Sequence, residues 1–385
     1  MTWYWIVFIS LLFFTFYEQF CKNNEVTIRL ISLAYTIFFI FMASIRWGGT
    51  LGDWRGYKMV FDVMINMNSI TDLFNISYWP FEPLYYIVMR LIKYFTNSYT
   101  LLLVFMAIVA IYGYYRAAVY VSTPREIYEQ TYGPDRSILL ASFLAFWSIC
   151  CANIFTVRTN MAVALCMYSV KYIEEKKPIR FIIMVAIATM FHFTAIIFLP
   201  AYFIYNVKLN YKWMARIFLL FIFVRIVGID KLLGLARLLG GRYAEKLEGA
   251  GYGDNGVVTY SYLSYSGAFL IIRAFANTAI IVVLILIIKH YMEDDPRYNG
   301  LVNLYICGAF LQAILLLYNL QVARLAIMYT FSQCLLLPYC LRIKTEKPNN
   351  RFIIFAGFAL FMAVKLYALL HSSPEYATFG TIFNQ

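Results

Sequence analysis

Residues 181–205 read FIIMVAIATMFHFTAIIFLPAYFIY, a run of 25 residues that contains no Asp, Glu, Lys or Arg. The hydrocarbon core of a bilayer is about 30 Å thick, and about 20 apolar helical residues cross it. Backbone polar groups in lipid must be satisfied within their own segment, so a run of this kind predicts helix. His192 stands at its middle and Pro200 near its end, which predicts a break in that helix.

Comparable apolar runs recur from one end of the chain to the other, with no soluble domain between them. The sequence is 62% hydrophobic and only 14% charged, which excludes a soluble monomer. We predict an all-α fold, a polytopic transmembrane helix bundle of about 11–12 membrane segments that forms a single domain over residues 1–385. The expected segments are Trp3–Phe20, Leu30–Ile45, Tyr99–Tyr120, Ile138–Cys151, Phe155–Tyr172, Phe181–Tyr205, Met214–Ile229, Phe269–Tyr291, Leu301–Leu320, Arg324–Leu341 and Phe352–His371.

Short loops rich in Lys and Arg set the predicted orientation, because such loops stay in the cytoplasm. They also account for much of the net charge of +12, so nucleic acid is not an expected partner. Two long loops, residues 46–98 and 230–268, are then expected outside. A single crossing by residues 181–205 would place the cationic stretch Arg342–Arg351 outside as well. We therefore predict two half-spans that meet around Phe191–Thr194, with His192 facing a cavity open to the outside.

Arginines gather on the predicted outer face. Four of them lie at or near the outer ends of four expected segments, and two more can join from the long loops. Guanidinium groups bind phosphate in bidentate fashion and stay charged when partly dehydrated, so such a cluster suits a lipid-linked diphosphate. The alternative is that each one is an anchor whose charged end reaches the membrane surface. The four are Arg46, Arg158, Arg273 and Arg324, and the two loop residues are Arg55 and Arg242.

Arg158 is the strongest single candidate in this set. It stands among apolar residues, between Val157 and Met161, in the first turn of an expected membrane helix. A charged residue in that setting costs about 2.5–3.5 kcal/mol on insertion, which makes a function the default hypothesis.

Three residues are candidates for a general base, which an acceptor hydroxyl group would need within hydrogen-bond reach. Asp53 lies in a glycine-rich stretch, Glu82 precedes Pro83, and His192 lies at the predicted break. The structural alternatives are a solvated turn residue for Asp53, a helix-start residue for Glu82 and a packed residue for His192. The spacing of His, Cys and acidic residues predicts no metal site, and no nucleotide-binding motif is present, so no metal or cofactor is expected.

Several of these stretches together resemble the EpsG/Wzy family of bacterial polysaccharide polymerases. The resemblance rests on the order and spacing of short motifs over nearly the whole chain. These motifs are Arg46 with Gly48, Asp53 and Tyr57, then Glu82-Pro83-Leu84-Tyr85, Val157-Arg158-Thr159-Asn160-Met161-Ala162 and Phe191-His192-Phe193-Thr194-Ala195, followed by Arg324.

The resemblance implies a metal-independent membrane glycosyltransferase of the GT-C-like type, in the bacterial cytoplasmic membrane with its active site facing the periplasm or outside. Its donor and acceptor would be oligosaccharide repeat units on undecaprenyl diphosphate, and its other partners membrane lipids and a protein that regulates chain length. Arg158, Arg273 and Arg324 would then bind the diphosphate with help from Arg46 and Arg55.

Other functions share parts of this pattern. A flippase for lipid-linked oligosaccharides would use the same arginines, but it should show paired repeats, which the sequence lacks. A membrane O-acyltransferase should carry charge at depth on the cytoplasmic side. A glycan ligase is mechanistically close to a polymerase, whereas a purely structural scaffold would not need outer-leaflet arginines at membrane depth.

Overall fold

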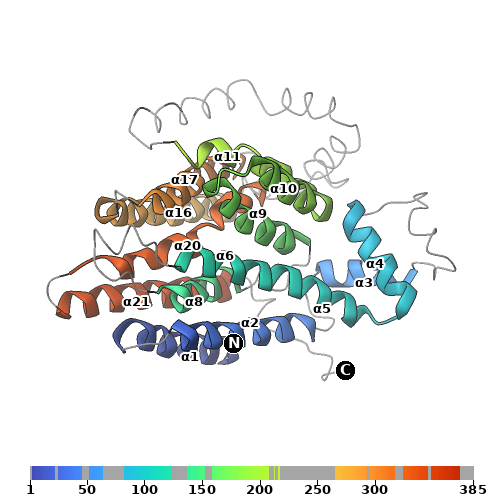
Figure 1. Cartoon of the computed structure of the whole chain (residues 1–385), viewed down its shortest axis with the longest axis horizontal. Helices are drawn as coiled ribbons and strands as arrows, with labels where there is room; N and C mark the ends of the chain where they lie inside the picture. The colour runs from blue at the N-terminus through green and yellow to red at the C-terminus, as the bar shows by residue number, and fades with distance from the viewer. Residues whose placement is uncertain are drawn as a thin grey trace. The chain divides into compact units, whose positions relative to one another are not determined.

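The computed structural model describes residues 2–21, 25–45, 52–63, 82–123, 137–151, 158–207, 212, 216, 265–292, 295–316, 324–345 and 348–372. Within these ranges every regular element is a helix (Figure 1), which confirms the all-α fold. The chain divides into two compact units. The first consists of Met1–Tyr202 with Cys334–Gln385, and the second of Phe203–Gln333.

Among the described residues, four helices are long and apolar enough to cross a membrane, as a membrane protein requires. Four shorter apolar helices accompany them. All of these coincide with predicted segments, whereas most of Met214–Ile229 lies outside the described residues and the total of 11–12 segments stays a prediction. The long helices are Thr2–Phe20, Glu25–Ser44, Tyr99–Ser122 and Asn349–His371, and the shorter ones are Leu139–Cys150, Pro178–Phe191, Phe193–Ile204 and Asn277–Tyr291.

The core of the first unit forms around α8 (Leu139–Cys150), with α1 (Thr2–Phe20), α2 (Glu25–Ser44) and α21 (Pro348–Ser372) against it (Figure 1). A helix that is apolar on every side is buried on every side, and α8 is nearly so. Its Trp147 shows how the packing is fixed. The indole N–H donates to the backbone carbonyl of Tyr4 at 3.0 Å, and the ring stacks on Phe39 at a centroid distance of 5.0 Å.

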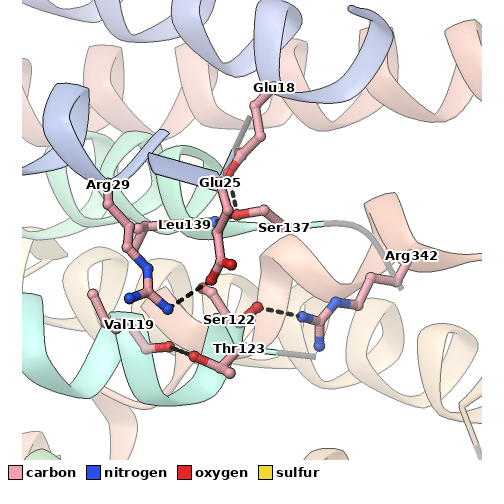
Figure 2. Close-up of polar contacts among 9 residues, drawn as sticks. All are labelled: Glu18, Glu25, Arg29, Val119, Ser122, Thr123, Ser137, Leu139 and Arg342. Atoms are coloured by element: carbon pink, nitrogen blue, oxygen red, sulfur yellow. Dashed lines mark hydrogen bonds and ion pairs between the residues drawn. The ribbon is translucent and has the colours of Figure 1, made fainter. Parts of the chain in front are cut away.

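A buried carboxylate ties the end of α1 to the start of α8. Glu18 accepts hydrogen bonds from the Ser137 hydroxyl at 2.7 Å and from the backbone N–H groups of Leu140 and Ala141, both at 3.1 Å. Figure 2 shows Glu18 directed at Ser137 and the first residues of α8. The first N–H groups of a helix lack partners within it and favour negative charge, so Glu18 satisfies two of them at once.

The segment Tyr99–Ser122 is one long helix with a π-helical turn inside it. It consists of α5 (Tyr99–Ala107), η2 (Ile108–Tyr112) and α6 (Gly113–Ser122). Tyr114 fixes it to α8, because its hydroxyl donates to the Ser142 carbonyl at 2.8 Å. Such π turns insert an extra residue and frequently mark functional sites.

A tight turn joins α9 (Arg158–Glu174) to α10 (Pro178–Phe191). Lys176 adopts a left-handed conformation with φ of 54°, and its N–H donates to the carbonyl of Ile173 at 3.0 Å. The next N–H, that of Lys177, donates to Tyr172 at 2.8 Å, which completes a Schellman motif. Because the connection is so short, the two helices run side by side in opposite directions.

The predicted break in the run 181–205 is present. The helix α10 ends one residue before His192, whose backbone is extended with φ of −151° and ψ of 115°. A 3₁₀ helix, η4 (Phe193–Phe198), and a short α11 (Ala201–Ile204) follow it. The ring of Phe181 lies 5.5 Å from that of Tyr202, so the second half returns along the first. This confirms the break and the return, while their direction relative to the membrane stays a prediction.

The second unit contains α16 (Tyr265–Tyr291) and α17 (Pro296–Leu316). Asp295 caps α17, since one of its carboxylate oxygens accepts the N–H groups of the second and third helical residues at 2.9 and 3.2 Å. The Nδ2 group of the fully buried Asn303 lies within hydrogen-bond distance of three backbone carbonyl oxygens, those of Ile204, Tyr205 and Val207, which share its two N–H bonds.

The predicted segment Arg324–Leu341 forms a series of short pieces rather than one helix. They are η5 (Arg324–Ala326), α19 (Ile327–Thr330), α20 (Gln333–Leu336) and η6 (Leu337–Arg342). Pro338 contributes to the interruption, because proline offers no N–H to an ongoing α-helix.

A glycine contact gives a stability prediction. A Cβ added at Gly308 would lie 2.5 Å from the Cβ of Tyr329 and 2.8 Å from the backbone nitrogen of Thr330, whereas nothing lies within 4 Å of one added at Gly357. Overpacking typically costs about 1–3 kcal/mol. We expect Gly308→Ala to lower the melting temperature of the detergent-purified protein by several degrees, and Gly357→Ala, the matched control, to leave it unchanged or higher. Equal melting temperatures for the two variants would contradict this packing.

Candidate active site

A buried ion pair joins Arg158 to Glu82. The Nη1 group of Arg158 donates to Oε2 of Glu82, and only 16% and 9% of the two side chains are exposed. Arg158 is the first residue of α9, and Glu82 directly precedes α4 (Pro83–Phe95). A charge this deeply buried needs a partner, and each of these residues supplies it to the other.

Two tyrosines complete the surroundings of the guanidinium. Its Nε donates to the hydroxyl of Tyr57 at 3.1 Å, and its central carbon lies 5.0 Å from the centre of the Tyr57 ring. The ring of Tyr85 lies 5.6 Å from the same carbon. Cations over aromatic faces are attracted by the ring quadrupole, so both rings favour the charged state of Arg158 where water is scarce.

The residues that follow the break after α10 also contact Glu82. The backbone N–H of Phe193, the residue after His192, donates to Oε1 of Glu82 at 3.5 Å. Phe193 is the first residue of η4, and a carboxylate is favoured at the start of a helix. The Nδ1 atom of His192 lies 2.6 Å from the Thr194 hydroxyl. Four segments that are distant in sequence therefore meet at the Arg158–Glu82 pair.

Local sequence explains why these side chains point inward. In α3 (Gly52–Val63), the aromatic residues Trp54, Tyr57 and Phe61 recur at helical spacing and share one face. Trp54 and Phe61 both pack on the ring of Tyr99, at centroid distances of 5.4 and 5.6 Å, so Tyr57 between them faces α4.

Glu82 occupies the N-cap position of α4, as the helix-start alternative predicts. Pro83 follows as the first helical residue, where its missing N–H costs nothing. The Glu82 side chain, however, makes no capping hydrogen bond to its own helix and turns to Arg158 instead. The helix start thus presents a carboxylate to another part of the chain.

The other predicted site residues stand as follows. Asp53 and Arg55 lie in α3, Arg273 lies in α16 and Arg324 begins η5, but their side chains lie outside the described part of the structure. Arg46 and Arg242 lie outside the described residues altogether. The structure thus brings together Arg158, Glu82 and the peptide after His192, and the convergence of the arginines stays a prediction.

Tyr57 and Tyr85 were not predicted as site residues. Tyr57 stands four residues after Asp53, and Tyr85 stands three residues after Glu82. Both lie in stretches that carry the resemblance, and that position was the available signal. Within the described ranges, no group of three or more His, Cys, Asp or Glu side chains could hold a metal ion.

The fold and this centre define a polytopic α-helical membrane protein with a buried arginine–carboxylate pair where a broken helix meets two others. The sequence model of the EpsG family matches residues 28–380, which is most of the chain, so the protein belongs to the EpsG family. Membership indicates a polysaccharide-polymerase type of function with glycosyltransferase-like activity. Comparisons with curated proteins and with solved structures gave no match.

Proposed function

We propose that this protein polymerises a polysaccharide by joining lipid-diphosphate-linked repeat units. It transfers the growing chain from its undecaprenyl diphosphate to the next lipid-linked unit. The observation that carries the proposal is the meeting of four segments at Arg158, all of which also carry the family resemblance. In such a reaction the bond from the sugar to the diphosphate breaks, and negative charge develops on the leaving diphosphate.

Arg158 is proposed to stabilise this developing charge. Fixed donors aimed at such charge act strongly where water is excluded, since they need no reorganisation during the reaction. Glu82 and Tyr57 hold the guanidinium in one orientation, so we assign Glu82 as a positioning residue. Because Glu82 also balances the charge of Arg158, the diphosphate needs further cations. Their candidates are Arg46, Arg55, Arg242, Arg273 and Arg324.

An acceptor hydroxyl needs a base, and the ion pair weakens Glu82 for that task by stabilising its charged form. His192 and Asp53 remain the base candidates. His192 stands next to the peptide that contacts Glu82, and its hydrogen bond with Thr194 fixes the direction of the imidazole. We place this centre on the periplasmic or outer side of the bacterial cytoplasmic membrane, in a GT-C-like bundle.

The test uses purified full-length protein reconstituted in lipid vesicles with a lipid-diphosphate-linked repeat unit and EDTA. We expect a ladder of products spaced by one repeat unit, since arginines rather than a metal are proposed to stabilise the leaving group. No ladder from a confirmed native substrate would contradict the polymerase assignment, and transport of that lipid across vesicles would be measured next. A ladder lost in EDTA and restored by Mg²⁺ would contradict the metal-independent mechanism.

A further inference from the structure

A second cationic cluster lies far from Arg158. A groove of about 380 Å³ opens between α2, α6 and α9, lined by the cations Arg29, Arg116 and Lys171 and by tyrosines that include Tyr112 and Tyr168. Arg158 and Lys171 are 13 residues apart on α9, which is about 20 Å along a helix. The groove is therefore a separate place from the candidate active site.

The side chains of the groove are organised by their own contacts. Arg116 donates to the Tyr112 hydroxyl at 3.4 Å and lies 5.8 Å from the centre of the Tyr168 ring. Lys171 lies 5.8 Å from the centre of the Tyr120 ring, whose hydroxyl donates to Glu174 at 2.8 Å. The tyrosines thus hold the two cations over the groove.

Three carboxylates border this cluster. Glu25 pairs with Arg29 at 2.6 Å, as Figure 2 shows, and Glu175 lies 3.6 Å from Lys171, while Glu174 accepts the hydrogen bond from Tyr120. Arg116 forms no ion pair with any described residue and is exposed. The groove therefore offers at least one cation that is not balanced by a carboxylate, together with phenol groups that can donate to an anion.

An apolar stripe leads from the groove along the same helix. Leu101, Phe105 and Ile108 are exposed, by 45%, 38% and 45%, and recur at helical spacing. Tyr112 and then Arg116 continue this row into the groove. An exposed apolar row that ends at a cation matches the shape of an anionic lipid. The apolar row can contact the acyl chains, and the cation can contact the charged headgroup.

We propose that this groove binds the phosphate of an anionic glycerophospholipid, whose acyl chains lie along the apolar row of Leu101, Phe105 and Ile108. Basic pockets between membrane helices bind such headgroups. The predicted orientation places this end of α9 at the cytoplasmic leaflet. A soluble phosphate shares the headgroup chemistry, but it would make no use of the stripe.

The experiment titrates detergent-purified, full-length protein with dioleoyl-phosphatidylglycerol or dioleoyl-phosphatidylcholine and counts bound lipid by native mass spectrometry. The variant Arg116→Gln/Lys171→Gln removes two groove cations. The matched control Lys177→Gln/Arg180→Gln removes two exposed cations at the start of α10, which lie outside the groove. We expect tighter binding of phosphatidylglycerol than of phosphatidylcholine, an apparent Kd at least tenfold weaker in the groove variant, and less than a twofold change in the control.

Equal weakening in both double variants would overturn the site in favour of general attraction between charges. Displacement of phosphatidylglycerol by an equal concentration of inorganic phosphate would assign the groove to a soluble anion and overturn the lipid. If the groove double variant does not fold, Arg116→Gln against Arg180→Gln gives the same comparison, because both positions are exposed.

Discussion

Replacing Arg158 by alanine is expected to reduce polymerisation by about a hundredfold or more. Removing one fixed donor to a developing negative charge typically costs about 10²–10³ in rate. The measurement is the rate of ladder formation by reconstituted protein at saturating substrate, with the amount of folded protein matched by size-exclusion chromatography. Full activity in a stably folded Arg158→Ala protein would rule out the proposed role.

Two conservative variants separate charge from geometry at this position. Arg158→Lys keeps the charge, but one ammonium cannot reproduce the forked contacts to Glu82 and Tyr57. Tyr57→Phe keeps the ring near the guanidinium and removes only the hydroxyl. We expect Arg158→Lys to lose nearly as much activity as Arg158→Ala, and Tyr57→Phe to lose less. If Arg158→Lys were fully active, activity would depend on the positive charge at this position and not on the planar guanidinium group.

Replacing Glu82 by alanine is expected to damage both stability and activity. It leaves the guanidinium of Arg158 buried without this carboxylate, and breaking a buried pair on one side typically costs about 3–5 kcal/mol. It also removes the acceptor for the Phe193 N–H. The measurement combines the melting temperature in detergent with the rate of ladder formation.

The double variant Glu82→Ala/Arg158→Ala is the control for this effect. It removes both charges, so much of the lost stability should return, while activity should not. Glu82→Gln keeps an acceptor for Arg158 without the negative charge. If Glu82 only positions Arg158, we expect Glu82→Gln to be less destabilised than Glu82→Ala and to keep partial activity. Complete loss of activity with unchanged stability would point to Glu82 as the base instead.

The features that depend on local sequence were predictable. Apolar length gave the helices, and His192 with Pro200 gave the break within residues 181–205, because helix and lipid impose simple rules on composition. The cost of burying a charge singled out Arg158 as a functional candidate. The structure gives this residue specific partners, and its function stays a prediction. The position of Glu82 at a helix start also followed from Pro83.

The partners themselves were not predictable from these rules. The carboxylate of Glu82 could either cap its own helix or pair with a cation 76 residues further along the chain. Only the tertiary structure determines that it pairs with the cation. Tyr57 faces inward because Trp54 and Phe61 pack on Tyr99, a contact that single-segment patterns do not contain. The division of Arg324–Leu341 into short helical pieces was likewise not predictable from the length of the apolar run.

The pairing of Glu82 with Arg158 bears on how the protein is made. Chains grow from the N-terminus, so Glu82 leaves the ribosome 76 residues before Arg158. An arginine that enters a bilayer alone costs about 2.5–3.5 kcal/mol, but this one arrives after its carboxylate. The hairpin that carries His192 follows and adds the Phe193 N–H to the same carboxylate. The nascent chain therefore contains every part of this charged centre before the second unit has been synthesised.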